Sequence, residues 1–172
     1  MNTAIYEITD DTGYLALVDH AAYMSFVDEN WTVAQLQEHF KAQMIAKHLL
    51  LWRTGREDVW RVQVSIEATG ARGFREIAGP IVVTAGRLLL TNYDSLSMAA
   101  SFRDVKLPET YQQNLVLNIP AGEYRCRIVQ ALAPSLFGDE VSEIRERASA
   151  DFFVELVTVS ESLPPWKNVP WT

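Results

Sequence analysis

The chain has 172 residues, a formal net charge of −7 and an apolar share of 48%, which suits one domain with an ample core. Its acidic balance disfavours direct binding to phosphate backbones, and its longest apolar runs are too short to cross a bilayer. We therefore expect residues 1–172 to form a single soluble domain that binds neither nucleic acid nor membrane.

The first part of the chain is predicted to hold short strands. Thr3–Ile8 alternates between apolar and polar side chains, and Tyr14–Val18 and Ala22–Val27 are further strand candidates. Asp10–Gly13 carries the Asp and Gly residues that are typical of a tight turn. These features indicate that the chain begins with β structure.

The strongest helix signal lies at residues 32–46. Thr32 is a suitable N-cap, and the apolar side chains that follow it recur every three or four residues, which places them on one helical face. These side chains are Val33, Leu36, Phe40 and Met44. We expect this helix to pack at the edge or end of a sheet structure.

The strongest strand signal is Leu49–Glu67, which predicts a β-hairpin: two strands joined by a tight polar turn. In the second strand apolar and polar side chains alternate, so that one set faces the core and the other faces water. The apolar set is Trp60, Val62, Val64 and Ile66, and the polar set is Arg61, Gln63, Ser65 and Glu67. Gly55 can adopt the positive φ that such a turn uses, and Trp52 and Trp60 are expected in the core.

A second strand pair is predicted at Glu76–Thr84 and Arg87–Thr91, around the sharp turn Ala85-Gly86. Asn92–Ser95 has the composition of a further turn, and Leu96–Phe102 is ambiguous between a strand and irregular structure. This region therefore adds strands, and no helix is expected in it.

The last third of the chain adds strands and a distinctive tail. Ala133–Ala150 is predicted to be a loop with a short helix near residues 140–147, and the Pro- and Trp-rich tail 161–172 is expected to pack Trp166 and Trp171 on the domain. Further strands are expected at Leu115–Ile119, Tyr124–Leu132 and Asp151–Val159. Many short strands with one strong helix predict a mainly β fold, a single-domain antiparallel β-sandwich with one short helix.

Residues that carry catalytic or metal chemistry are sparse. No HExxH, CxxC, GxSxG or P-loop motif occurs, and Gly70–Gly73 lacks the strand–loop–helix setting of a dinucleotide site. The supply of soft and nitrogen ligands is limited to His20, His39, His48 and Cys126. We therefore expect no enzyme activity, no metal site and no cofactor.

Charge is distributed unevenly along the chain. Residues 1–40 contain seven acids and no Lys or Arg, which equals the net charge of the whole chain. A solvated acidic face that aids solubility is the simpler interpretation of such a segment, and a surface for a basic partner is the alternative. Exposed aromatic side chains beside acids are good interface anchors. The residues predicted to bind a partner are Asp10, Asp11, Asp19, Asp28, Glu29, Tyr93 and Asp94.

Two stretches carry resemblances to known families. Ala78–Phe102 followed by Leu117–Gln130 resembles an uncharacterised family of small proteobacterial β-rich proteins, which implies no activity. The order of parts also resembles the competence-type inhibitors of a DNA-entry nuclease, on the basis of short markers spread along the chain. These markers are Trp31-Thr32, Trp52-Arg53, Pro80-Ile81 and Pro120–Tyr124. The second resemblance implies a β-sandwich inhibitor but transfers no inhibitory residue.

The sequence thus supports two functional hypotheses. The first is a protein-binding inhibitor, such as an immunity protein that neutralises a cognate bacterial toxin or nuclease through an acidic surface. The alternative is a sandwich domain that binds a small molecule or carbohydrate without catalysis. The single Cys126 and the absence of a secretory signal at the N-terminus favour the cytoplasm.

Overall fold

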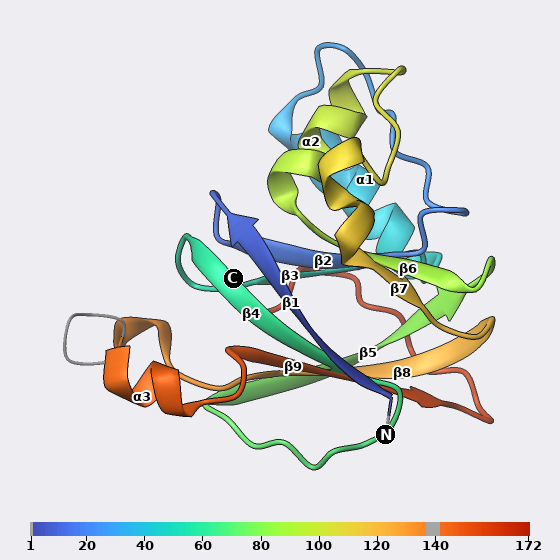
Figure 1. The fold of residues 1–172 in the computed structure, drawn as a ribbon. Helices are drawn as coiled ribbons and strands as arrows, with labels where there is room; N and C mark the ends of the chain where they lie inside the picture. Colours follow the sequence, from blue (N-terminus) through green and yellow to red (C-terminus); the bar gives the residue numbers. More distant parts are fainter. Residues whose placement is uncertain (1, 137–141) are drawn as a thin grey trace.

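The computed structural model describes residues 2–136 and 142–172 and contains two β-sheets that face each other (Figure 1). The five-stranded sheet has the order β1-β4-β9-β8-β5 and the four-stranded sheet the order β3-β2-β6-β7. The five-stranded sheet consists of β1 (Thr3–Asp10), β4 (Asp58–Ser65), β5 (Arg75–Val83), β8 (Gly122–Gln130) and β9 (Phe152–Thr158). The four-stranded sheet consists of β2 (Tyr14–Val18), β3 (Leu49–Arg53), β6 (Arg87–Asn92) and β7 (Val116–Asn118). The predicted mainly β sandwich is confirmed, and its strands pair antiparallel except for β4 with β9.

Helices cover the outer face of the four-stranded sheet. They are α1 (Val33–Ile45) and α2 (Tyr93–Ser101), while α3 (Ser142–Arg147) lies beside the five-stranded sheet, and η1 (Thr110–Leu115) and η2 (Pro134–Leu136) are short 3₁₀ turns (Figure 1). The helix predicted at residues 32–46 is confirmed as α1. Thr32 caps it, and the Thr32 and Gln35 side chains bond reciprocally to each other's backbone N–H groups.

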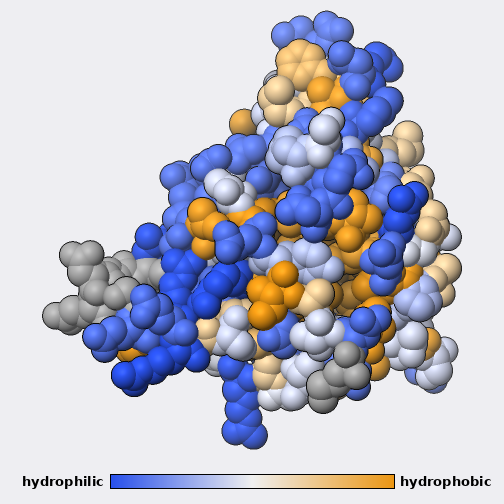
Figure 2. Space-filling view, viewed as in Figure 1, coloured by the Kyte–Doolittle hydropathy of each residue, from blue (hydrophilic) through white to orange (hydrophobic). Residues whose placement is uncertain are grey.

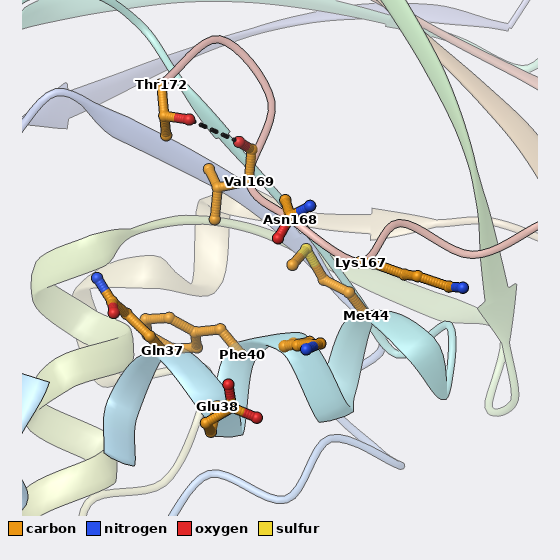
Figure 3. A pocket seen from close by; sticks show the side chains of 9 residues that line it. Gln37, Glu38, Phe40, Met44, Lys167, Asn168, Val169 and Thr172 are labelled. Atoms are coloured by element: carbon orange, nitrogen blue, oxygen red, sulfur yellow. Dashed lines mark hydrogen bonds between the residues drawn. The ribbon is translucent and has the colours of Figure 1, made fainter. Parts of the chain in front are cut away.

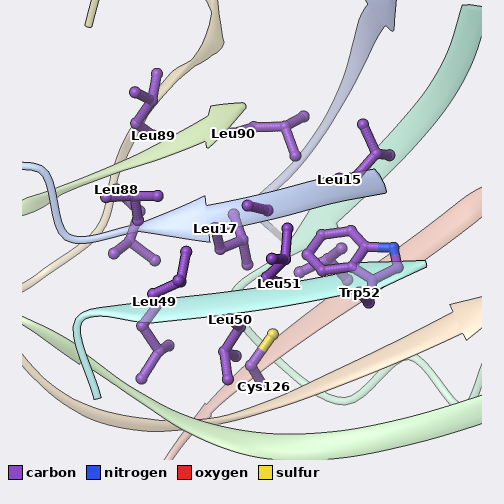
Figure 4. Close-up of a cluster of buried hydrophobic side chains, with 14 of the residues drawn as sticks. Leu15, Leu17, Leu49, Leu50, Leu51, Trp52, Leu88, Leu89, Leu90 and Cys126 are labelled. Atoms are coloured by element: carbon purple, nitrogen blue, oxygen red, sulfur yellow. The ribbon is translucent and has the colours of Figure 1, made fainter. Parts of the chain in front are cut away.

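The four-stranded sheet is buried on both faces. Leu49–Trp52 and Leu88–Leu90 are continuous apolar runs and are at most 2% exposed (Figure 4). A strand with one face toward water would alternate, whereas a strand between two layers is apolar throughout. The five-stranded sheet lies on one side of these runs, where Trp52 meets Phe152 with 6.3 Å between ring centroids, and α1 and α2 lie on the other.

Strand β4 shows the opposite pattern. Trp60, Val62 and Val64 are buried and pack into the core, whereas Arg61 and Gln63 are half-exposed. The predicted alternation is therefore confirmed from Trp60 to Val64 in a sheet with one solvated face. Ser65, predicted to face water, is 1% exposed, and Ile66 and Glu67 lie beyond the end of the strand.

Both predicted hairpins are wrong, although their strands exist. Strand β3 pairs with β2, and β4 pairs with β1 and β9, so the chain changes sheets at residues 54–57. In the same way β5 pairs with β8 and β6 pairs with β2 and β7, so the chain changes sheets again at residues 84–86. The change of pattern from a two-sided apolar run to an alternating run marks these crossings.

The carboxylate of Asp10 holds two crossings together. Its Oδ1 accepts the backbone N–H groups of Thr12, Gly13 and Tyr14 at 2.7–3.1 Å, which shapes the β1–β2 turn. Its Oδ2 accepts the Thr54 hydroxyl at 2.8 Å and the Trp60 indole N–H at 3.0 Å, which fixes the β3–β4 connection. One buried side chain thus satisfies five donors from two segments.

Two other local predictions are wrong. Residues 93–101 form helix α2 rather than a turn followed by a strand or irregular structure, because the Asn92 side chain accepts the N–H of Ser95 at 3.0 Å and caps a helix. Ala22–Val27 is a loop rather than a strand. Tyr23 is buried and donates its N–H to the Asp19 carbonyl, and Val27 donates its N–H to Ala100 of α2.

The expected packing of the tail is confirmed. The Trp166 indole N–H donates to the Ala78 carbonyl at 2.9 Å, and a Cβ placed on Gly79 would lie 2.4 Å from that indole. The Trp171 ring lies 4.3 Å from the guanidinium carbon of Arg75. Helix α3 falls within the helix predicted near residues 140–147, whose first two residues lie outside the described part of the chain.

We predict that Asp10→Ala lowers the free energy of unfolding by about 3 kcal/mol, because five buried donors lose their acceptor. Urea denaturation at neutral pH measures the change. Asp11→Ala, at the exposed neighbouring position, is the control and should stay within about 0.5 kcal/mol of the parent protein. An equally small effect at Asp10 would contradict the anchoring role.

Candidate functional site: an acidic and apolar surface at helix α2

The first turn of α2 brings two predicted acids together. Asp94 follows the Asn92 cap and faces the β1–β2 turn, which carries Asp11. Burial raises the pKa of Asp94, and the negative charges of Asp11 and Asp10 raise it further. Its Oδ2 is buried and has no hydrogen-bond partner in the described part of the chain. Hydrogen bonds from the backbone of Asp11 and Asp94 lower the pKa of this carboxyl, but burial and the two negative charges outweigh them, so its charge is only partly stabilised.

Exposed apolar side chains follow Asp94 on and just after the same helix. Met98 lies one turn after Asp94 on α2, and Phe102 is the C-cap residue with which the helix ends; they are 49% and 47% exposed. Tyr111 of η1 is 64% exposed and shares a 2.5 Å hydrogen bond between its hydroxyl and the Ser95 Oγ. Figure 2 shows apolar side chains among hydrophilic ones over this end of the molecule. We call Asp11, Asp94, Met98, Phe102 and Tyr111 the α2 surface.

Two of the predicted contact residues do not reach the surface. Asp10 is 1% exposed, and its carboxylate accepts hydrogen bonds from the backbone of the β1–β2 turn and from the side chains of Thr54 and Trp60. Asp19 is fully buried, and its Oδ2 accepts the Thr84 N–H at 3.0 Å. The expectation that Asp10 and Asp19 face a partner is corrected, because both carboxylates fix backbone segments inside the fold.

Asp28 and Glu29 are exposed but lie away from Asp94. The Asp28 N–H donates to the Ala100 carbonyl near the C-terminal end of α2, whereas Asp94 lies in its first turn. Nine helical residues separate the two ends by about 13 Å. Nearby, the guanidinium carbon of Arg103 lies 4.0 Å from the Phe26 ring centroid and adds a positive charge. The predicted acids thus form two groups rather than one patch.

Tyr93 is half-buried and serves packing. Its ring lies 5.5 Å from Tyr14 of β2 and 6.0 Å from Phe40 of α1, measured between centroids. Burial raises the pKa of its hydroxyl. Tyr93 therefore joins α2 to α1 and to the four-stranded sheet, and exposes only part of its ring.

A groove runs between α1 and the tail. Two adjoining cavities of about 430 and 360 Å³ share Gln37, Phe40, Val169 and Thr172 (Figure 3). Met44 extends the apolar lining of the first cavity, and Tyr93 lines the second. The groove therefore leads from the tail toward the base of α2.

The prediction of a strand or irregular structure at residues 96–102 hides the exposed positions of Met98 and Phe102. A signal was present: Asn92 three residues before Ser95 is a capping pattern, and the spacing from Asp94 to Met98 to Phe102 is helical.

Two negative findings apply to residues 2–136 and 142–172. No three side chains of His, Cys, Asp or Glu in these ranges gather where they could hold a metal ion. No helix within them is both long and apolar enough to cross a membrane.

The fold is similar to two solved structures. The protein of crocagin biosynthetic gene J aligns with a TM-score of 0.59 and 18% identity over 92% of this chain and 99% of its own. ComJ from Bacillus subtilis, the inhibitor of the DNA-degrading activity of NucA, aligns with a TM-score of 0.51 and 11% identity over 91% and 96%. No family model and no curated protein matches the chain, so the resemblance to an uncharacterised family stays a prediction.

We predict that Asp94→Asn raises the free energy of unfolding at pH 7. Because the folded pKa of Asp94 lies above its ordinary value of 3.8, the ionised form is disfavoured by folding, and this penalty disappears as the pH falls below that value. The gain should therefore shrink between pH 7 and pH 4 in urea denaturation. Asp28→Asn, at an exposed site, should change stability little at either pH, and a destabilising Asp94→Asn at pH 7 would refute the assignment.

Proposed function

We propose that the protein is an inhibitor that binds a basic bacterial protein, such as a nuclease or toxin, through the α2 surface, in the cytoplasm and without catalysis. The observation that carries the proposal is the exposure of Asp94 and Met98 on α2 and of its C-cap Phe102, together with Asp11 and Tyr111. These residues combine three exposed apolar side chains with two carboxylates.

The two kinds of side chain have different roles in binding. Met98, Phe102 and Tyr111 offer apolar area that a partner can remove from water, which provides affinity. Asp11 and Asp94 attract a basic partner and speed its association. A nuclease must hold phosphates and therefore has a basic active site, so an acidic surface with an apolar centre is suited to cover it.

The unfavourable position of Asp94 supports the same reading. A carboxylate with a raised pKa and an unbonded oxygen lowers the stability of the folded chain, and such groups are retained where function requires them. A cationic partner group placed against the half-exposed Asp94 would favour its charged form and offset part of the penalty.

The similarity of the fold to ComJ favours a nuclease as the target class. The markers that resemble competence-type nuclease inhibitors, such as Trp31-Thr32 and Trp52-Arg53, point the same way. An immunity protein that neutralises a cognate toxin would bind its target through the same physical interactions.

The proposal is tested with the tagged protein as bait in the lysate of its own host at low and moderate salt. We expect a stoichiometric basic protein to be captured, with less at the higher salt. The captured protein is then purified and its DNA-degrading or toxic activity is measured, and equimolar inhibitor should abolish that activity.

The double variant Asp11→Lys, Asp94→Lys should slow association with the purified partner by roughly tenfold or more. Glu146→Lys with Glu161→Lys makes the same charge change at two exposed sites elsewhere and is the matched control. Equal slowing in both variants would refute the α2 surface. A partner whose activity is unaffected by binding would refute the inhibitor role.

The groove between α1 and the tail favours a second candidate function, the binding of a small molecule or carbohydrate. Its cavities of about 430 and 360 Å³ lie within the usual range for ligand sites and have an apolar lining that includes Phe40, Met44 and Val169. Polar groups at Gln37 and Lys167 are available to orient a ligand.

This second function predicts that a metabolite raises the melting temperature of the protein without any protein partner. A thermal-shift screen of a metabolite and sugar library measures it. Gln37→Trp, at an exposed position on the groove wall, should abolish the shift by filling the groove, and Ala34→Trp, exposed on the same helix but absent from the groove lining, should preserve it. A shift that persists in Gln37→Trp would place the ligand elsewhere.

A further inference from the structure

The two sheets end in four edge strands, and three of these edges are protected. The edges are β1 and β5 in the five-stranded sheet and β3 and β7 in the four-stranded sheet. The tail covers β3, whose Arg53 N–H donates to the Pro170 carbonyl at 3.3 Å. It also covers β5, whose Ala78 carbonyl accepts the Trp166 indole N–H. Strand β5 carries Pro80, which has no N–H to offer, and β7 is only three residues long.

Strand β1 has none of these protections. It pairs with β4 over eight consecutive residues, from Thr3 to Asp10, without a bulge, and it contains no Pro, Gly or Lys. Within residues 2–136 and 142–172, no segment forms a backbone hydrogen bond to the outer edge of Thr3–Glu7. This edge is therefore long, regular and open, which is the geometry that accepts a further strand.

The contacts of β1 show which of its backbone groups point outward. In an antiparallel pair the N–H and C=O of one residue point to the same side, and the side alternates along the strand. The Asn2 carbonyl accepts the Ile66 N–H next to β4, so even-numbered residues face β4. The Thr9 carbonyl instead accepts the side-chain amide of Asn92 from the other sheet, at 2.8 Å. Odd-numbered residues of β1 therefore face the open edge.

Three residues remain available on this edge, namely Thr3, Ile5 and Glu7. Ile5 is the middle one, and its apolar side chain is 56% exposed on the outer face of the sheet. Glu7 lies opposite Arg61 of β4 in the register, which places a positive charge beside it. The centre of the open edge is thus apolar, and its one acid lies to the side.

We propose that the open edge of β1 pairs with the same edge of a second copy of this chain, antiparallel and with the two-fold axis at Ile5. In this register Ile5 meets Ile5 of the second copy, and Thr3 meets Glu7 at both ends. Every one of these residues points its backbone outward, so each pair exchanges two N–H to C=O hydrogen bonds. The two exposed isoleucine side chains come together and leave water.

The chain itself selects this register and this occupant. A slip by one pair would place Ile5 against Glu7, and a slip by two pairs would place the two Glu7 carboxylates against each other. Pairing also has to end at Glu7, because the next outward carbonyl, that of Thr9, is already bonded to Asn92. A segment that is complementary to itself around one residue fits a two-fold dimer.

Self-association is measured by sedimentation velocity on the untagged full chain over a range of micromolar to millimolar concentrations, at moderate salt because each copy carries a net charge of −7. We expect a reversible monomer–dimer equilibrium. Ile5→Lys should weaken dimerisation by roughly tenfold or more, because it puts two like charges at the axis. Val157→Lys makes the same charge change at a 39% exposed valine on the central strand β9 and should weaken it far less.

A cysteine at the axis provides a second measurement that depends on a gain. The two Cα atoms of a hydrogen-bonded pair lie about 5.5 Å apart, within the range of a disulfide. Ile5→Cys should therefore give a disulfide-linked dimer under mild oxidation. Thr9→Cys is the matched control, equally exposed on β1, and its two copies would lie about 27 Å apart and should not cross-link. The native Cys126 is buried and stays out of the reaction.

Three outcomes would overturn the proposal. The first is a chain that stays monomeric up to millimolar concentration. The second is a dimer that Ile5→Lys and Val157→Lys weaken equally. The third is equal cross-linking of Ile5→Cys and Thr9→Cys, which would place the contact in another register or on another surface.

Discussion

The fold depends on one buried carboxylate at the corner where the chain changes sheets. Asp10 ends a strand of the five-stranded sheet, shapes the turn into the four-stranded sheet and fixes the segment that returns from it. The turn that it shapes carries Asp11 beside Asp94 of α2. The proposed α2 surface therefore takes part of its geometry from the same few hydrogen bonds.

Burial of the four-stranded sheet on both faces decides where the helices lie. Its outer face is too apolar to be left in water, so α1 and α2 must cover it. Once α2 is packed through Leu96 and Ala100, its opposite face with Met98 is left exposed. The tail closes part of the remaining gap beside α1 and leaves the groove. The surface features proposed to be functional are thus what remains after this apolar layer has been covered.

The sequence predicts the individual strands and helix α1 better than it predicts which strands pair with one another. The alternation in β4 and the spacing in α1 reflect burial of one face, which a local pattern records. The hairpins failed because a short turn has the same composition whether the strands pair or separate into two sheets. Asp10 and Asp19 were read as surface acids because sequence does not show which carboxylate a backbone turn encloses. Asp11 and Asp94 lie at the surface, exposed and half-exposed, but their approach across 83 positions depends on tertiary structure alone.

The place of β9 has a consequence for how the chain folds during synthesis. This strand lies between β4 and β8 in the middle of its sheet, although it is the last strand along the chain. Until the ribosome has released residue 158, β4 and β8 each present an open edge with unpaired backbone groups. The nascent chain therefore exposes these two edges until β9 arrives, and partners that shield open strand edges would protect it from association during this interval.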